Sequence, residues 1–319
     1  MSFNRDVKNE LKSVIPAARH CQLSEIAAIL SICGIVNITT YNMVEIEVRT
    51  ENSAVASKFN ALVRRCFHIA PRVLVRGHSN NHDHHIYIQT IDDNDEAIKI
   101  LKAVKLMNHD GEINETLSLV DNVLIQRSCC KRAFIRGSFL ATGSMSDPEK
   151  QYHYEIVLND IDKAEQIRDI LKGFDLGAKI TARKNYHVVY VKEGANIVDV
   201  LNIMEAHKSL MELENIRIVR DMRNKVNRRV NCETANINKT VSAAVKQIED
   251  IRYIKEHAGL GSLKDNLRET AELRLLEPEL SLTDLGQMLN PPVGKTGVYH
   301  RLRKLSIIAD ELRQGSSDN

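Results

Sequence analysis

The sequence contains no tryptophan, and aromatic residues make up only 4% of its 319 positions. Proteins that hold single strands or RNA loops stack bases on exposed aromatic rings, so this scarcity disfavours both modes of binding. No uninterrupted apolar stretch approaches the ~20 residues that span a bilayer, and the N-terminus lacks the apolar core of a signal peptide. Walker and G-x-S-x-G motifs are also missing. We therefore expect a cytoplasmic protein that does not insert into membranes.

Cysteine is too sparse for a disulfide scaffold, and there is no C-x-x-C pair. We expect the cysteines to be reduced thiols or small buried side chains. One polar turn gathers possible metal ligands at His78, His82, Asp83, His84 and His85. Histidines on a surface turn without a supporting ligand pattern are usually incidental, so we expect no metal and no cofactor.

The net charge of +2 conceals an asymmetry between the two ends of the chain. Residues 217–319 contain 18 Lys and Arg against 14 Asp and Glu, whereas the remainder contains 26 against 28. The C-terminal third is therefore the part expected to contact a polyanion.

Two segments rich in small residues, 26–34 and 135–143, are predicted to be helices that end in glycine. Each is followed by the same pattern of a strand, a helix, two strands and a helix. Gly34 and Gly143 are 109 residues apart, and so are Glu47 and Ile156 in the strands that follow. The equal offset predicts one duplicated α-β-α-β-β-α unit whose two small-residue helices pack together at a pseudo-two-fold axis. Residues 110–131, between the copies, are predicted to form a helix and a linker.

Both segments resemble the LAGLIDADG helix of homing endonucleases, which carries an acidic residue just before its last glycine. The corresponding positions here are Cys33 and Thr142. Metal-assisted cleavage needs acids that hold divalent cations, and neither a thiol nor a neutral hydroxyl replaces a carboxylate. We therefore expect a scaffold that binds DNA without cutting it and that has no catalytic residue.

Beyond residue 214 the composition becomes basic. A helix is predicted at 216–231 with Asp221 as its only acid, and another at 240–257. Candidates for phosphate contact in the first of these are Arg217, Arg220, Arg223, Lys225, Arg228 and Arg229. A solvated helix face or an inter-domain linker would carry the same charges, and the sequence leaves these alternatives open.

Residues 265–313 predict a helix–turn–helix arrangement. A helix at 267–276 stops before Pro278, and Ser281 with Asp284 forms the start signal of a helix at 282–289. A turn at 290–294 leads into a helix that begins at Lys295 and runs through Leu305. On this last helix the spacing of Val298, Leu302 and Leu305 predicts a buried stripe.

A different face of the same helix carries Thr296, Tyr299, His300 and Arg303, which we expect to reach base edges in the major groove. The residues predicted to contact DNA are Ser281, Thr283, Lys295, Thr296, Tyr299, His300, Arg301, Arg303 and Lys304. A helical bundle that contacts protein is the alternative. The absence of any acid between Lys295 and Ile308 favours duplex DNA.

Three long segments, 131–150, 221–236 and 289–305, resemble the WhiA family of bacterial DNA-binding regulators, and the resemblance extends over the whole chain. We expect an α+β fold in which a duplicated, degenerate LAGLIDADG homing-endonuclease-like domain covers residues 1–213. Basic linker helices are expected at 214–260 and an all-α helix–turn–helix domain at 261–319.

The resemblance also implies roles in transcription, cell division and chromosome segregation, and in sporulation where the organism sporulates. The expected function is that of a sequence-specific regulator of transcription that binds double-stranded DNA without nuclease activity. We expect a nucleoid-associated monomer, with other transcription or division proteins open as partners. Two alternatives remain: a regulator whose LAGLIDADG-like domain docks a ligand or protein instead of DNA, and a residual homing-type endonuclease that uses other acids.

Overall fold

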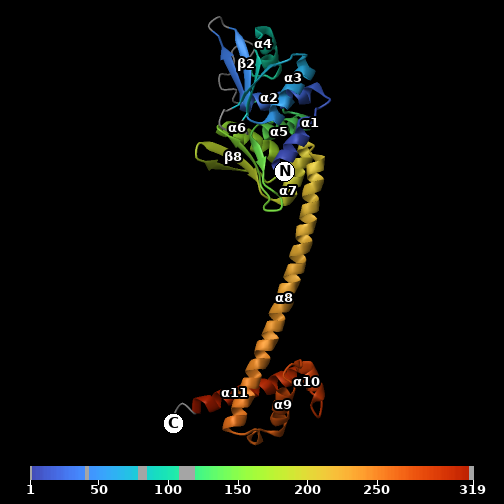
Figure 1. Ribbon diagram of the computed structural model, residues 1–319, viewed down its shortest axis with the longest axis vertical. Coiled ribbons are helices and arrows are strands. Elements are labelled where there is room, and N and C mark those ends of the chain that lie inside the picture. Colours follow the sequence, from blue (N-terminus) through green and yellow to red (C-terminus); the bar gives the residue numbers. More distant parts are fainter. Residues whose placement is uncertain (1, 40–42, 78–84, 108–118, 316–319) are drawn as a thin grey trace. The chain divides into compact units, whose positions relative to one another are not determined.

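The computed structural model describes residues 2–39, 43–77, 85–107 and 119–315. The chain forms two compact units, residues 1–220 and 221–319. In the first unit, two long helices pack against each other and a four-stranded antiparallel sheet lies beside each of them (Figure 1). The predicted histidine turn, apart from His85, lies outside the described residues.

The duplication predicted from the sequence is confirmed. After the helix α1 (Phe3–Ser13), the first copy contains α2 (Arg19–Cys33), β1 (Gly34–Ile38), β2 (Val44–Thr50), α3 (Ser53–Phe67), β3 (Arg72–Gly77), β4 (His85–Ile91) and α4 (Asn94–Ala103). The second contains α5 (Ser128–Thr142), β5 (Gly143–Met145), β6 (Tyr154–Leu158), α6 (Ile161–Lys172), β7 (Lys179–Arg183), β8 (Tyr186–Val191) and α7 (Gly194–Met204). The strand orders, β1-β2-β4-β3 and β5-β6-β8-β7, are the same in the two sheets.

Each copy has one strand more than the sequence pattern predicted. The additional strands, β1 and β5, follow α2 and α5 without an intervening residue and pair antiparallel with β2 and β6. A Cβ atom at Gly143 would lie 2.6 Å from the Phe139 carbonyl oxygen, so only glycine lets the chain leave the helix directly as a strand. β5 has three residues and β1 reads GIVNI, so neither strand shows an alternation of apolar and polar residues.

The strand register corrects the predicted correspondence between the copies. Gly34 pairs with Val48, and Gly143 pairs with Ile156. The paired positions in β2 and β6 are therefore 108 residues apart, and Glu47 corresponds to Glu155 instead of Ile156. The offset of 109 holds along the helices α2 and α5, which have equal lengths of 15 residues.

The connections also differ from the prediction. Residues 119–127 contain no helix, and residues 108–118 lie outside the described part of the chain. Where the sequence predicted two basic helices, α8 is one helix over His207–His257. Residues 231–239 have modest helix propensity but include neither glycine nor proline, so nothing in them forces the helix to end.

The helices α2 and α5 approach closely because small residues face each other. A Cβ atom at Gly137 would lie 2.9 Å from both the Ala28 Cβ and the Glu25 carbonyl oxygen. This confirms the predicted packing of the two small-residue helices. The surrounding apolar core is continuous through both copies.

A buried ionic group crosses this helix pair. Glu25 of α2 accepts hydrogen bonds from Arg136 Nε (3.0 Å) and Nη2 (3.1 Å) of α5. Lys58 Nζ of α3 lies 3.0 Å from the same carboxylate, and the Glu25 and Lys58 side chains are fully buried. Glu205 adds a second carboxylate 3.1 Å from Arg136 Nη1.

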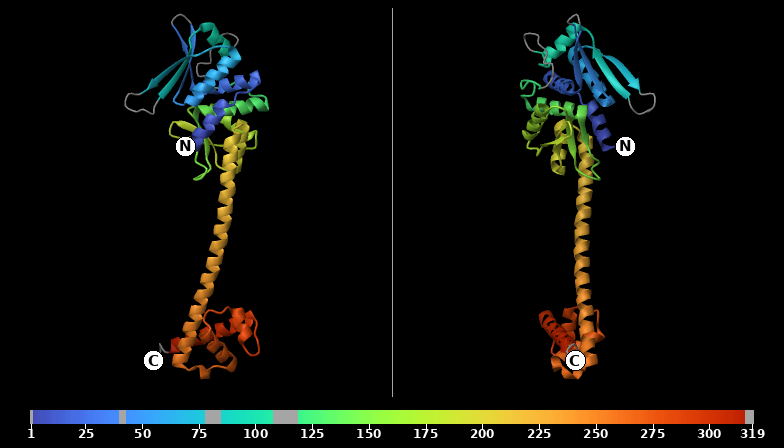
Figure 2. Two further views of the ribbon diagram at one scale, coloured as in Figure 1. Left: turned by 45° about the vertical axis from the view of Figure 1, so that its right-hand side comes forward. Right: turned by 90° about the vertical axis from the view of Figure 1, so that its left-hand side faces the viewer.

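The second unit contains the end of α8 together with α9 (Asp265–Leu276), α10 (Leu282–Met288) and α11 (Lys295–Gly315) (Figure 2). Their apolar side chains form a core of their own. Among the described residues, no helix has the length and apolar character needed to cross a membrane.

Candidate nucleic-acid interface

The predicted helix–turn–helix stripe is the core of the second unit. Val298, Leu302 and Leu305 are each no more than 1% exposed and pack with Ile251 and Ile254 from α8. The helix α11 continues to Gly315, beyond the predicted end at residue 305. Apolar residues at 308, 309 and 312 extend the stripe there, which explains the additional length.

The turn between α10 and α11 depends on a glycine. Gly286 is buried, its carbonyl oxygen accepts a hydrogen bond of 2.8 Å from Val293 N, and the Val293 carbonyl occupies the position of a Cβ. At the start of α10, Ser281 Oγ accepts a hydrogen bond of 3.3 Å from Asp284 N, which confirms the predicted cap. The sequence predicted the turn from its prolines, but it gave no signal that Gly286 was part of it.

A buried arginine fixes α10 against its neighbours. Arg274 of α9 is 3% exposed. It donates to the Leu280 carbonyl (2.7 Å) and, through two nitrogens, to Gln247 Oε1 of α8 (2.9 and 3.1 Å). Burial lowers the pKa of this guanidinium. On sequence alone, Arg274 is one of many cations in this region, and its role arises only from the packing.

Six of the residues predicted to contact DNA share an exposed surface on α11. These are Lys295, Thr296, Tyr299, His300, Arg303 and Lys304. Lys295, Arg303 and Lys304 form no ion pair with any residue that the structure describes. The absence of acids from Lys295 to Ile308 leaves this surface positively charged.

Three other predicted contact residues have different surroundings. Arg301 is half-buried, and its Nη1 donates to the Asn266 carbonyl and to Thr270 Oγ1 of α9, both at 3.3 Å. Ser281 and Thr283 are exposed at the start of α10, although the Ser281 hydroxyl also takes part in the helix cap.

The predicted phosphate contacts on α8 fall into two groups. Arg217 pairs with Glu214 at 2.9 Å. This pair lies within α8, whereas Arg220 donates to the Pro148 carbonyl (2.8 Å) and lies 4.7 Å from the centre of the Tyr152 ring, so Arg220 holds α8 to the rest of the first unit. The remaining four, Arg223, Lys225, Arg228 and Arg229, are exposed, and Arg229 pairs with Glu233 at 2.9 Å.

Cations occupy the ends of the helices where an endonuclease would carry its acids. Cys33 and Thr142 are the last residues of α2 and α5. Lys8 of α1 interacts electrostatically with Cys33, and its Nζ lies 5.7 Å from the centre of the Phe139 ring on α5. Lys163 Nζ donates to the Ser31 carbonyl at 2.6 Å.

Burial lowers the pKa of Lys8 to about 8 and raises the pKa of the Cys33 thiol to about 11. A protonated thiol, a hydroxyl and an ammonium do not fit Mg²⁺, which prefers carboxylate oxygens. The sequence could not place Lys8 here, because its position depends on how α1 packs.

Replacing Lys8 by methionine is expected to remove a pH-dependent gain in stability. An unfolded lysine titrates near pH ~10.4. The folded pKa of Lys8 is about 8, so above that pH the unfolded state binds more protons than the folded state. The free energy of unfolding of the wild type therefore rises with pH. Urea unfolding of both proteins between about pH 7.5 and 8.5 tests this. The opposite contribution of Cys33 begins as an unfolded thiol titrates, near pH ~8.5, and it largely cancels in the comparison because both proteins contain Cys33. Parallel pH profiles for the two proteins would contradict the expectation.

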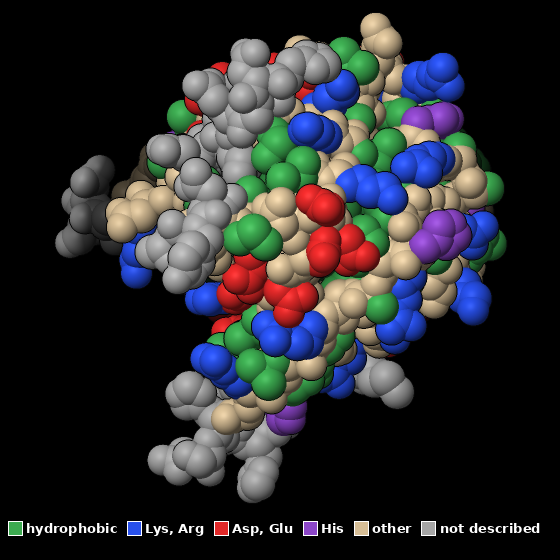
Figure 3. Space-filling view, turned by 90° about the horizontal axis from the view of Figure 1, so that it is seen from above, with side chains coloured by type: hydrophobic (Ala, Val, Ile, Leu, Met, Phe, Trp, Pro, Cys, Tyr) green, Lys and Arg blue, Asp and Glu red, His purple; other side chains and the backbone are tan. Residues whose placement is uncertain are grey.

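The sheets of the first unit carry cations that are mostly neutralised. Arg49 pairs with Glu47, and Arg183 lies 3.4 Å from Glu155 at the corresponding place in the second sheet. Arg72 lies 3.5 Å from Asp92. On the face shown in Figure 3, acidic side chains gather among basic ones. Because acidic side chains neutralise most of these cations, the sheets are less suited to binding a phosphate backbone than the exposed surface of α11.

Comparisons with known proteins cover both units. Three family models match: the WhiA N-terminal LAGLIDADG-like domain at residues 19–107, the WhiA LAGLIDADG-like domain at 131–223 and the WhiA C-terminal HTH domain at 226–309. A "Probable cell division protein WhiA" from Lachnoclostridium phytofermentans is 50% identical over 98% of this chain and 100% of its own length. One from Alkaliphilus oremlandii is 44% identical over 100% of both chains.

Among solved structures, full-length WhiA from Thermatoga maritima matches with a TM-score of 0.58 and 25% identity. The match covers 98% of this chain and 99% of that one. The likeness therefore extends over both LAGLIDADG-like copies and the helix–turn–helix unit.

Proposed function

The chain belongs to the WhiA family, and on that premise we propose that it is a sequence-specific regulator that binds double-stranded DNA through α11. The observation that carries this proposal is the exposed surface of α11, which is basic, free of acids and free of ion pairs with other described residues. In helix–turn–helix proteins the second helix enters the major groove and presents its N-terminal residues to the bases.

The residues of this surface divide by the kind of contact they suit. Arg303 can donate two parallel hydrogen bonds to guanine, and Thr296, Tyr299 and His300 lie on the same face. Lys295 and Lys304 flank them and suit phosphate oxygens, as do Ser281 and Thr283 at the start of α10. Arg301 is hydrogen-bonded to α9. It contributes to DNA binding by fixing the orientation of α11 against α9 and by adding a positive charge.

The exposed cations of α8 supply contacts that do not depend on sequence. Arg223, Lys225, Arg228 and Arg229 project from a helix whose residues 221–243 are all exposed. We assign residues 1–213 to the LAGLIDADG-like domain and residues 214–260 to the basic connection. We assign residues 261–319 to the domain that recognises the DNA site. Arg217 and Arg220 keep a structural role at the start of this connection.

Two substitutions separate base recognition from phosphate contact. Arg303→Ala is expected to weaken binding to the preferred duplex by about 1–3 kcal/mol while affecting random duplex much less. Arg229→Ala should weaken binding to both duplexes alike and lower the slope of log K against log salt by about one. Anisotropy titrations on a duplex selected from a random library, at several salt concentrations, measure both effects.

Arg268→Ala is the matched control, because Arg268 lies on α9, outside the predicted DNA-contacting residues, and pairs with Asp265 at 2.8 Å. It should bind both duplexes as the wild type does. Equal losses on preferred and random duplex for Arg303→Ala would contradict its assignment to base recognition.

The first unit is proposed to have lost cleavage, which supports a non-enzymatic role. Lys8, Cys33 and Thr142 replace the carboxylates that would hold Mg²⁺. Incubation of supercoiled plasmid with Mg²⁺ or Mn²⁺ distinguishes this from a residual endonuclease, which would cut in proportion to the purified protein.

The paired cations on the sheets favour a second candidate role for the first unit, namely docking of a protein or ligand. Under this alternative, residues 217–319 alone would bind DNA as tightly as the full chain.

We further propose roles in transcription, cell division, chromosome segregation and, where relevant, sporulation, for a monomer associated with the nucleoid in the cytoplasm. Genome-wide mapping of bound sites in the source cell tests these assignments.

A further inference from the structure

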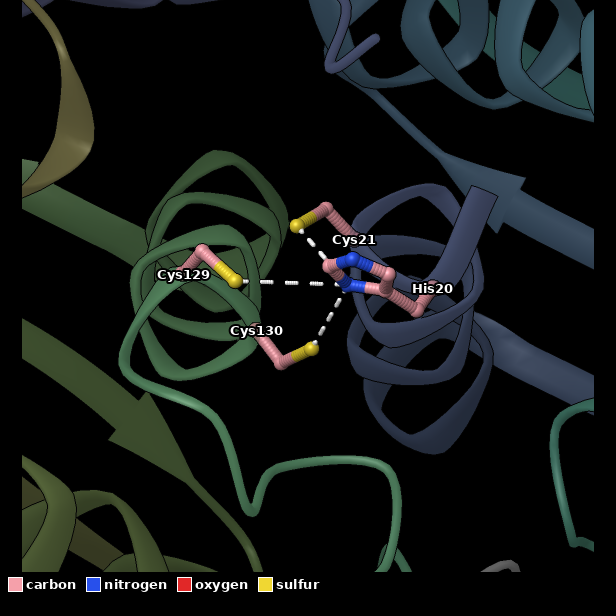
Figure 4. Close-up of side chains that lie close together, drawn as sticks. All are labelled: His20, Cys21, Cys129 and Cys130. Carbon is pink, nitrogen blue, oxygen red and sulfur yellow. Dashed lines mark hydrogen bonds between the residues drawn. The ribbon is translucent and has the colours of Figure 1, made fainter. Parts of the chain in front are cut away.

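A cluster of one imidazole and three thiols lies between the first turns of α2 and α5 (Figure 4). His20 and Cys21 come from α2, and Cys129 and Cys130 come from α5. Their nitrogen and sulfur atoms all lie within 4.8 Å of one another. The proposed DNA-binding function uses none of these residues.

The separations from His20 Nδ1 to the three sulfur atoms are close to the edges of one coordination tetrahedron. His20 Nδ1 lies 3.2 Å from Cys130 Sγ, 3.3 Å from Cys21 Sγ and 4.0 Å from Cys129 Sγ. Zinc binds sulfur at about 2.3 Å and imidazole nitrogen at about 2.0–2.1 Å, so ligand atoms around one ion lie about 3.5–3.8 Å apart. Small rotations of the side chains would bring all four atoms to a single ion.

The internal repeat explains how two adjacent residues on α2 come to face two adjacent residues on α5. With the helix offset of 109, His20 corresponds to Cys129 and Cys21 corresponds to Cys130. Each copy therefore contributes the same two positions, and the pseudo-two-fold axis passes through the cluster. Ser24 Oγ donates a buried hydrogen bond of 2.8 Å to the Cys130 carbonyl, which holds the two helix ends together.

Burial raises the pKa of the Cys21 and Cys130 thiols, so the metal itself must displace their protons, and the exposed side of the cluster allows metal entry. Three thiolates with one Zn²⁺ leave a single negative charge, which the positive ends of two helices stabilise. Arg127, which interacts electrostatically with Cys130, adds a positive charge. Cys21 and Cys130 are buried at 6% and 3% exposure, whereas Cys129 is exposed and His20 is half-buried.

We propose that His20, Cys21, Cys129 and Cys130 bind one Zn²⁺ ion that clamps the two copies of the repeated unit at the start of α2 and α5. Soft thiolates with an imidazole select zinc over Mg²⁺ or Ca²⁺, and four protein ligands make a closed, structural site. Binding releases the thiol protons to solvent and needs no oxidant or reductant.

The test uses the full chain, reconstituted with zinc under a non-chelating reductant and freed of excess metal. We expect about one zinc per chain by elemental analysis. Replacement by Co²⁺ should give the visible bands of a tetrahedral site and thiolate-to-cobalt absorption in the near ultraviolet. Removal of zinc by a chelator should lower the Tm by several degrees.

Cys129→Ser removes one ligand at an exposed position, so folding should be preserved. It should weaken zinc binding roughly a hundredfold and alter the cobalt spectrum. The matched control is Cys232→Ser, an exposed cysteine on α8, which should bind metal as the wild type does.

Three outcomes would overturn the proposal. One is a wild-type chain that retains no stoichiometric zinc or cobalt after reconstitution. Another is equal binding by Cys129→Ser and Cys232→Ser. The third is a disulfide within the cluster that persists under the reductant, because it would remove the thiolate ligands.

Discussion

Glu25→Ala is expected to lower the free energy of unfolding of the first unit by about 3–5 kcal/mol, because it leaves two cations in the core without their shared carboxylate. Arg136 makes two hydrogen bonds to Glu25, and Lys58 Nζ lies 3.0 Å from it. Burial lowers the pKa of Lys58, and the charge of Glu25 opposes that effect. Without Glu25, Lys58 would lose its closest negative charge.

Urea unfolding of the variant at neutral pH measures this loss. Glu165→Ala is the control, because Glu165 is also a helical glutamate paired with an arginine, Arg168 at 3.3 Å, but its side chain is 50% exposed. Its loss should stay below about 1 kcal/mol. Similar losses for the two variants would show that the buried ionic group is not the source of the effect.

Gly286→Ala is expected to destabilise the second unit by about 3 kcal/mol and to abolish recognition of the preferred duplex. The added Cβ would overlap the Val293 carbonyl oxygen and approach Val298 Cγ2 at 3.0 Å. The carbonyl belongs to the backbone of the turn, so it cannot move without displacing the start of α11. That displacement would shift the base-reading side chains away from the groove.

The control for this prediction is the same substitution a few residues later. A Cβ at Gly294 would meet nothing within 4 Å, so Gly294→Ala should fold and bind DNA nearly as the wild type does. Thermal unfolding and duplex titration of both variants give the comparison. Comparable losses at Gly286 and Gly294 would contradict the role assigned to the turn.

The helix–turn–helix and the duplicated unit could be predicted from the sequence, because both depend on patterns of nearby residues. The helix–turn–helix was predicted from one cap, one proline-containing turn and the spacing of Val298, Leu302 and Leu305. The duplication was predicted from an offset of 109 residues for the motif glycines and for the strands that follow, although the strands correspond at an offset of 108. The sequence did not predict β1 and β5, because neither strand shows an alternation of apolar and polar residues. It did not predict the continuity of α8 either, because residues 231–239 have only modest helix propensity.

The candidate sites were harder to predict because they depend on contacts between distant segments. The sequence predicts DNA contacts for both Arg301 and Arg303, and only the packing of α9 separates a supporting arginine from an exposed one. The offset of 109 was the signal that could have paired His20 with Cys129 and Cys21 with Cys130.

The buried ionic group has a consequence for how the two halves of the first unit recognise each other. Through the offset of 109, Glu25 corresponds to Phe134, and Arg136 corresponds to Ala27. The first half thus supplies Glu25 with Lys58, and the second half supplies Arg136 with Glu205. Two copies of the first half would lack the two hydrogen bonds from Arg136 to Glu25, and two copies of the second half would bring two guanidinium groups together. The two halves are therefore complementary, and as separate polypeptides they should associate as unlike pairs in preference to like pairs.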